Sequence, residues 1–283
     1  MPLRSNPTAR QQRLGAEVRR MRERAGITAR AAAAFLGSSP MYQSHVETGR
    51  SGISEERIRR LAAHCGCDDV AYVDALVSMA NERGKGWWEG HRGVIDPLGL
   101  ALAECEHHAT RIRTFQVVHI PGLLQIEDHI RAAFRFIDPA RSREMEDAHV
   151  TFRSLRQQVI IGERARPYEA LIHEAALRIQ AGGRKTALAQ LEHIADLSGL
   201  PNVTIRVIPF ASQDFAGGGY PLLYLSGPVT QLDTAQADTP RGSVFFDEEQ
   251  DLGEYRARYE RVEQTALPAD KSRELISRLI REL

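Results

Sequence analysis

The chain has 283 residues, and its 37 lysines and arginines balance 37 aspartates and glutamates, so the formal net charge is zero. This length is enough for one small domain and one larger domain. No apolar run approaches the length of a membrane span, and the first residues lack the apolar core of a signal peptide, so we expect a cytoplasmic protein. Three cysteines are too few for a disulfide framework.

Three helices are predicted near the start of the chain. Thr28 and Ser39 are suited to cap the second and third helices, and Pro40 falls at the first helical position of the third. Gly37 and Gly49 stand where these two helices end. Two short helices joined by a tight turn are typical of a helix-turn-helix, which places one helix in the DNA major groove. An ordinary pair of packed helices is the alternative, since caps and glycines occur in every helical protein, but the spacing favours the DNA-binding interpretation.

The charge is distributed unevenly along the chain. Residues 1–66 contain twelve arginines, no lysine and five glutamates, which gives this segment a net charge of +7 and the remainder −7. A basic surface attracts phosphate and binds it in a salt-dependent way. A run of charge is often only a solvated surface, but here it coincides with the helix-turn-helix pattern. DNA binding is therefore the leading hypothesis.

Further along the chain, a fourth helix is predicted from Ser54 and a fifth up to about Ala80, followed by glycines around two tryptophans. We predict a DNA-binding domain at 1–82, a linker with a connecting helix at 83–110, and a regulatory or partner-binding domain at 111–283. In this last domain the predicted strands are 114–120, 168–173, 203–209, 222–225 and 244–246. The predicted helices there are 123–136, 143–161, 186–198, 249–266 and 270–283. The expected fold is a mainly α N-terminal domain of five helices, followed by an α+β domain with a small antiparallel sheet.

Residues 14–66 resemble the DNA-binding domain of the lambda-repressor-type, Xre-like family. This resemblance implies five helices, of which the second and third form the helix-turn-helix. It also implies a buried ion pair between Arg22 in the first helix and Glu47 at the end of the third. Such a pair would fix the recognition helix to the rest of the domain.

The same resemblance indicates which side chains contact DNA. It places base-reading positions on Pro40, Met41 and His45, and it places Gln43 where the family usually has an inward isoleucine or valine. Met41 suits a thymine methyl, while His45 or Gln43 suits a base edge. The remaining polar side chains are better placed for phosphates, which position a protein without specifying sequence. The expected DNA-contacting residues are Thr28, Arg30, Ser39, Met41, Tyr42, Gln43, Ser44, His45 and Arg50.

The rest of the chain has a resemblance of its own. It is carried by the segments GWWEG (86–90), TFQVVHIPGLLQIEDHIRA (114–132), RQQVI (156–160), LPNVTIRVIPF (200–210) and GSVFFDEE (242–249). These resemble a C-terminal domain of unknown function that follows Xre-type domains in Streptomyces-like actinobacteria, in WhiJ-like developmental regulators and antitoxin-like regulators. The resemblance implies a transcription regulator. It also implies that the C-terminal domain interacts with a small acidic protein encoded nearby.

Patterns that would indicate catalysis or metal binding are incomplete. His173-Glu174 begins like the zinc-peptidase motif HExxH, but Leu177 occupies the position of the second histidine. Cys65 and Cys67 lack a second ligand pair at zinc-site spacing. We therefore expect no catalytic residues, no metal, no cofactor and no enzymatic activity.

Two further features have structural explanations that we prefer. Gly217–Gly219 lacks the strand, helix and Lys-Ser/Thr of a phosphate-binding loop. Trp87, Trp88 and Phe115 are candidates for the wall of an effector pocket, because aromatic side chains often line such sites. Packing against the second domain or its core is the interpretation we favour for all three.

These observations favour a sequence-specific regulator that binds double-stranded DNA as a homodimer and reads an inverted repeat with its third helix. The C-terminal domain would serve dimerisation, partner binding or both. One alternative is an antitoxin-like protein-binding module with weak DNA binding, which the unusual residues Ala29, Pro40, Met41 and Gln43 favour. Another is a small-molecule sensor or enzyme in the C-terminal domain.

Overall fold

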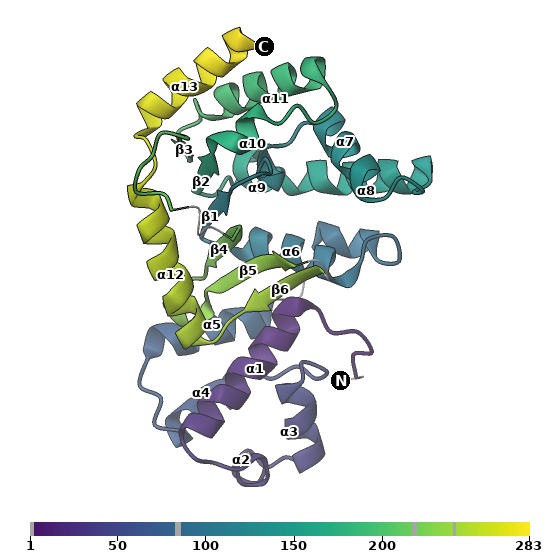
Figure 1. Ribbon diagram of the computed structural model, residues 1–283. Helices are drawn as coiled ribbons and strands as arrows, with labels where there is room; N and C mark the ends of the chain where they lie inside the picture. The colour runs from purple at the N-terminus through teal and green to yellow at the C-terminus, as the bar shows by residue number, and fades with distance from the viewer. Residues whose placement is uncertain (1–2, 83–85, 217–219, 240–241) are drawn as a thin grey trace. The chain divides into compact units, whose positions relative to one another are not determined.

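The computed structural model describes residues 3–82, 86–216, 220–239 and 242–283. The chain divides into two compact units, Met1–Gly90 and His91–Leu283 (Figure 1), and each is described by itself. In the described ranges, no helix is both long enough and apolar enough to cross a membrane.

The described part of the N-terminal unit is helical. Its α-helices are α1 (Ala9–Arg24), α2 (Ala29–Phe35), α3 (Pro40–Glu47), α4 (Glu55–His64) and α5 (Val70–Asn81). A short 3-10 helix, η1 (Trp87–His91), covers the end of this unit and the first residue of the next. Each α-helix begins after a side chain that accepts a hydrogen bond from a first-turn backbone N–H. These caps are Thr8, Thr28, Ser39, Ser54 and Asp69. The apolar faces of the helices meet in a core that includes Leu14, Val18, Met21, Leu36, Val46 and Leu61.

Two glycines shape the connections on either side of α3. Gly37 follows α2 with a φ of +63°, and Gly49 follows α3 with a φ of +73°. Backbone in this left-handed region favours glycine because a Cβ atom would clash there. Each glycine therefore ends a helix sharply, and α2 and α3 form a helix-turn-helix.

The C-terminal unit is built on a six-stranded sheet. Its strands are β1 (Arg111–Gln116), β2 (Tyr168–His173), β3 (Val203–Ile208), β4 (Leu222–Ser226), β5 (Thr234–Thr239) and β6 (Gly242–Phe246). Their order across the sheet is β3-β2-β1-β4-β5-β6. The strands β1, β2 and β3 run parallel to one another, whereas β1–β4, β4–β5 and β5–β6 are antiparallel pairs. The sheet is therefore mixed.

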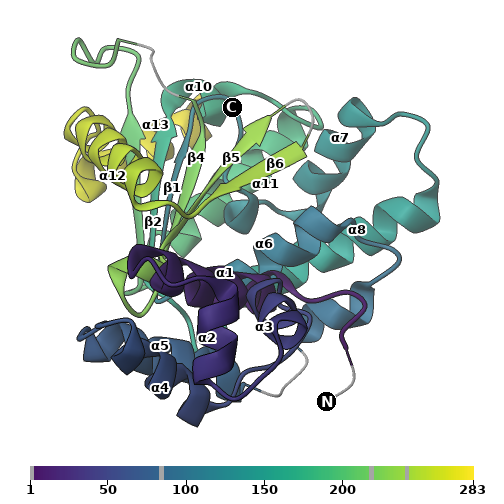
Figure 2. The same cartoon turned by 90° about the horizontal axis from the view of Figure 1, so that it is seen from below.

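Helices connect the strands and cover the sheet. They are α6 (Pro97–His108), α7 (Glu127–Ile137), α8 (Arg143–Arg156), α9 (Gln158–Ile161), α10 (Glu174–Arg178), α11 (Arg184–Leu197), α12 (Glu249–Gln264) and α13 (Ala269–Glu282). Two 3-10 turns, η2 (Gly122–Leu124) and η3 (Thr230–Leu232), complete the connections in the described ranges. Figure 2 shows α12 on one side of the strands and α11 on the other.

Each face of the sheet packs against its own hydrophobic core. On one face, Leu191 of α11 and Ile276 of α13 belong to the same cluster as Ala170 of β2. On the other face, Tyr259 of α12 belongs to a cluster with Leu171 of β2. Because neighbouring residues of a strand point to opposite faces, a strand covered on both sides is buried along its whole length. Every residue of β2 is indeed buried.

The prediction of a small antiparallel sheet is wrong, although the α+β class is confirmed. The sheet has six strands, and its first three are parallel. Parallel neighbours need a long crossover, and here α7 to α9 join β1 to β2 while α10 and α11 join β2 to β3. The alternation of strands and helices from 111 to 208 is the sequence pattern that would have predicted parallel pairing.

Candidate nucleic-acid interface

Helix α3 has one face directed toward solvent and another directed into its unit. Met41, Ser44 and Thr48 are exposed and His45 is half-buried. These four residues recur at spacings of three and four, so they lie on one side of the helix, which we call the outward face of α3. On the opposite side, Gln43 and Val46 are buried. The outward face is the part of α3 that is free to enter a DNA groove.

The inward side of α3 is fixed by an ion pair between Arg22 of α1 and Glu47. Arg22 donates from Nε to Glu47 Oε1 at 2.7 Å and from Nη2 to Glu47 Oε2 at 2.8 Å. Both side chains are only 8% exposed. The hydrogen bond to Glu47 is the largest cause that raises the pKa of Arg22. A buried bidentate pair of this kind fixes the direction as well as the distance of its two partners.

Gln43 joins this pair, and the prediction that it reads a base edge is wrong. Its side chain has no exposed surface, and its Nε2 donates to Glu47 Oε1 at 2.7 Å. Its Oε1 is buried without a hydrogen-bond partner. Gln43 therefore occupies the inward position that the family resemblance assigned to isoleucine or valine, and a polar side chain reaches Glu47 from there.

Helix α1 packs directly against the backbone at the end of α3. A Cβ atom on Gly15 would lie 2.5 Å from the carbonyl oxygen of Val46 and 2.7 Å from that of Glu47. Only glycine permits such an approach. Nearby, the buried Glu17 accepts hydrogen bonds from Arg13 Nε and from the hydroxyl of Tyr72 in α5, each at 2.7 Å. The scaffold behind α3 is thus tied together from α1 to α5.

Most of the other expected DNA-contacting residues lie at the surface. Thr28, Arg30, Ser39 and Arg50 are exposed. Thr28 Oγ1 accepts from the backbone N–H of Ala31 at 3.2 Å, and Ser39 Oγ accepts from that of Tyr42 at 3.1 Å. Both hydroxyls therefore stand at helix N-termini, where backbone N–H groups favour an anion.

Tyr42 is held more tightly than the sequence indicated. Its hydroxyl donates to the carbonyl oxygen of Gly52 at 2.7 Å, and the guanidinium of Arg57 lies 5.0 Å from the centre of its ring. Because the hydroxyl proton is already engaged, a phosphate near Tyr42 would meet the guanidinium of Arg57 first. The sequence analysis missed Arg57. Its only indication in the sequence was its position in the first turn of α4, directly after Glu55 and Glu56.

Arg4 is a second basic residue that sequence reasoning missed. Its Nη1 donates to the carbonyl oxygen of Gly49 at 3.0 Å, and its backbone N–H donates to that of Arg50 at 2.9 Å. The segment before α1 therefore lies beside the C-terminal end of α3. Arg4 and the exposed Arg50 bring two positive charges to that end of the helix.

The suggested effector-pocket residues are placed differently from one another. Phe115 has no exposed surface and packs in the core cluster beneath α12, so the core interpretation that we favoured is confirmed and the effector-pocket alternative is wrong for this residue. Trp88 is buried and Trp87 is half-buried, with their rings edge to face at 6.0 Å between centroids. The suggested loop Gly217–Gly219 lies outside the described residues.

The residues weighed for metal binding or catalysis have structural roles in the described ranges. His173 Nδ1 accepts the backbone N–H of Ala175 at 3.1 Å and so caps α10, and its ring packs against Phe210 and Phe215. Burial lowers the pKa of His173. Cys65, Cys67 and Cys105 are not joined in disulfides, and no group of three or more potential metal ligands occurs among the described residues.

Comparison with known protein families gave two matches. A model described as Helix-turn-helix domain matches residues 13–76, which run from α1 into α5. A model described as Domain of unknown function (DUF5753) matches residues 100–278, which run from α6 into α13. No curated protein and no solved structure matches the chain. The first match is consistent with DNA binding through α2 and α3.

Proposed function

The chain belongs to the family defined by the Domain of unknown function (DUF5753), and from this membership and its helix-turn-helix we propose that it is a sequence-specific DNA-binding transcription regulator. The observation that carries the proposal is the division of α3 into two faces. Its inward face is fixed through Glu47 to Arg22 at 2.7 Å, whereas Met41 on its outward face is 70% exposed. A rigidly held helix with a free outer face is what major-groove recognition requires.

The side chains at this surface have separate proposed roles at the DNA. Met41 contacts a thymine methyl and His45 donates to or accepts from a base edge. Ser44, Arg30 and Arg50 contact phosphates, as do the N-termini of the helices that follow Thr28 and Ser39. Arg4 and Arg57 add to this phosphate contact.

We propose that the protein acts as a homodimer. A dimer places two recognition helices about 34 Å apart, one turn of DNA, and so reads an inverted repeat. Residues 1–82 form the DNA-binding part, 83–110 connect the two parts, and 111–283 serve dimerisation, partner binding or both. In this proposal the protein is an actinobacterial Xre-like regulator of the WhiJ-like or antitoxin-like kind, works in the cytoplasm, carries no enzymatic activity, and has a small acidic protein as its partner.

A second candidate function is an antitoxin-like protein-binding module with weak DNA binding. The observation that favours it is the composition of the outward face of α3, where the apolar Met41 is 70% exposed. Removing Gln43 from the base-reading set leaves His45 as the main polar side chain for base edges. An apolar face of this kind also suits a protein partner.

Selection of bound fragments from random and genomic DNA, at two salt concentrations, separates the two functions. The regulator predicts enrichment of an inverted repeat with half-site centres about one helical turn apart. Weak binding that falls steeply with salt and yields no motif would favour the protein-binding module, because phosphate contacts alone carry no sequence preference.

A further inference from the structure

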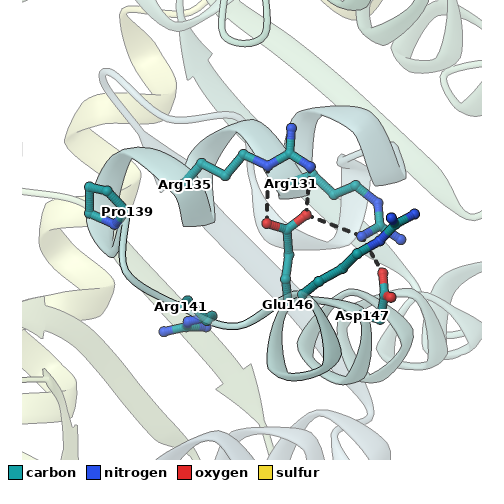
Figure 3. Close-up of a pocket in the computed structure, with 7 residues that line it drawn as sticks. Arg131, Arg135, Pro139, Arg141, Glu146 and Asp147 are labelled. Atoms are coloured by element: carbon teal, nitrogen blue, oxygen red, sulfur yellow. Dashed lines mark hydrogen bonds and ion pairs between the residues drawn. The ribbon is translucent and has the colours of Figure 1, made fainter.

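A basic cavity lies between α7 and α8 in the C-terminal unit. Its volume is about 620 Å³, and its lining residues are Arg131, Arg135, Pro139, Arg141, Arg143, Glu146 and Asp147 (Figure 3). Four guanidinium groups thus meet two carboxylates in one hollow. The volume lies in the range of sites that hold small molecules.

Glu146 holds two of these arginines in place. Its carboxylate accepts from Arg135 Nε at 3.0 Å and Nη2 at 2.9 Å, and from Arg131 Nη1 at 3.2 Å. Arg131 Nη1 also donates to Asp147. Figure 3 shows both arginines of α7 reaching toward Glu146 on α8. The hydrogen bond from Arg135 is the largest cause that lowers the pKa of Glu146, so this buried carboxylate is ionised at neutral pH.

Several donors in the cavity remain unused after these contacts. Within the described residues, Arg135 Nη1 and Arg131 Nη2 make no hydrogen bond, and the exposed Arg143 makes no ion pair. Arg141 donates from Nε to Asp138 at 3.3 Å and stacks on Phe134, but its Nη1 is buried without a partner. A buried donor without an acceptor is unusual, and an anion bound in the cavity would supply acceptors for these arginines.

We propose that this cavity binds the phosphate group of a small phosphomonoester. Guanidinium groups match phosphate oxygens in charge and in forked geometry. Arg141 and Arg143 contact the phosphate directly, together with the unused nitrogens of Arg131 and Arg135. Glu146 is a positioning residue, because its carboxylate lines the cavity but acts by ordering the two α7 arginines and does not itself bind the anion. Helix α8 begins at Arg143, so its N-terminus lies next to one of the lining arginines.

The ligand is a phosphomonoester and not a carboxylate because of the charge in the cavity. Glu146 and Asp147 already supply two carboxylates, and Asp138 offsets part of the charge of Arg141. A further singly charged carboxylate would gain little there. A phosphomonoester carries about −1.5 to −2 charges at neutral pH and offers three acceptor oxygens, which suit the unused donors.

The test measures binding of inorganic phosphate and phenyl phosphate to the full chain by titration calorimetry, with ionic strength held constant by chloride. Wild-type protein is expected to bind both probes. The double variant Arg141→Gln/Arg143→Gln is expected to bind them at least about tenfold more weakly, because it loses two charge-assisted contacts. The matched control Arg164→Gln/Arg184→Gln removes two exposed arginines away from the cavity and should bind as wild type does.

The single variant Arg143→Gln controls for misfolding of the double variant. It should not disturb the fold, since this exposed side chain makes no ion pair within the described residues. It should also weaken phosphate binding while leaving the circular dichroism spectrum unchanged. Equal affinity of all variants, or no binding to the wild type, would overturn the proposal. Loss of DNA affinity in the double variant, without phosphate binding by the wild type, would also overturn it and assign these arginines to nucleic acid. Because the readout is phosphate binding, this result does not depend on whether α3 reads DNA.

Discussion

At the scale of single residues, the position of α3 depends on one buried ion pair. Replacing Arg22 or Glu47 with alanine leaves the other side chain buried without its bidentate partner, so each change should destabilise the N-terminal unit by about 3–5 kcal/mol. Hydrogen exchange of the α3 amides in the full chain measures this loss. Arg19→Ala is the matched control, because its pair with Glu23 is 61% and 48% exposed and such pairs contribute about 0–1 kcal/mol. A loss of less than about half a kcal/mol for Arg22→Ala would contradict a structural role for the pair.

His129 predicts a specific dependence of stability on pH. Burial, followed by the charges of Arg153 and His119, lowers the pKa of His129 to about 4. Its Nδ1 is buried without a hydrogen-bond partner in the structure. The unfolded chain binds this proton near a pKa of about 6.5, so as pH falls the unfolded state gains it first. The stability that the neutral His129 gives to the folded state is therefore fully present above about pH 6.5, and it is lost as the pH falls toward about 4.

Between pH 7 and pH 4.5 this loss should be about 2–3 kcal/mol for the wild type. His129→Gln, whose amide stays neutral, should lack that part of the pH dependence. Chemical denaturation of both proteins at the two pH values measures the difference. Identical pH dependence in the two proteins would show that His129 is not held neutral by the fold.

Individual residues also show where sequence reasoning succeeds and fails. The pairing of Arg22 with Glu47 was predicted from the resemblance alone, and the structure has the two side chains 2.7 Å apart. Gln43 was misassigned because an amide is as typical of base readout as of a buried hydrogen bond. Only the three-dimensional position of Glu47, one helical turn away, decides between these roles.

At the scale of elements, α1 acts as the platform for α3. A side chain on Gly15 would lie 2.5 Å from the backbone oxygen of Val46, which cannot move without shifting α3. Gly15→Ala should therefore destabilise the N-terminal unit by about 1–3 kcal/mol, the usual cost of overpacking, although alanine favours helices. Thermal unfolding measures the effect, and Gly90→Ala is the control because no atom lies within 4 Å of its added Cβ. Equal stability of both variants would mean that α1 and α3 are loosely packed.

The end of α3 should contribute to DNA affinity through Arg50, which is exposed. Arg50→Ala should weaken binding to all DNA sequences alike and reduce the slope of log affinity against log salt by about 1. Binding titrations over a range of salt concentrations measure both quantities. Arg281→Ala in α13 removes an exposed charge from the C-terminal unit and should leave the slope unchanged. A loss confined to one DNA sequence would contradict the phosphate role of Arg50.

Among the elements, the sheet was harder to predict than the helices. The helix-capping residues and the glycines predicted the helix-turn-helix correctly, because each of them acts on the backbone within a few residues of its own position. The strand β5, TAQADT, was missed since only its alanines are apolar and two of its residues are exposed. Its place in the sheet depends on pairing with β4 and β6, which no local pattern reveals.

At the scale of the whole molecule, two family matches divide the chain into a helix-turn-helix part and a larger part of unassigned function. The basic charge of the first 66 residues and the acidic charge of the rest follow this division. A basic charge on the part that contains the helix-turn-helix is consistent with DNA binding by that part. The cavity between α7 and α8 is an exception within the acidic part, because arginines dominate its lining.

The central claim is that the outward face of α3 reads DNA, and fragment selection with His45→Ala beside the wild type tests it most directly. The account predicts that both proteins enrich an inverted repeat, and that the variant loses base preference at one position of each half-site, with a cost of about 1–3 kcal/mol against the wild-type site. Ser78→Ala, at an exposed position of α5, should reproduce the wild-type motif. An unchanged motif for His45→Ala, or no motif for the wild type, would contradict the account.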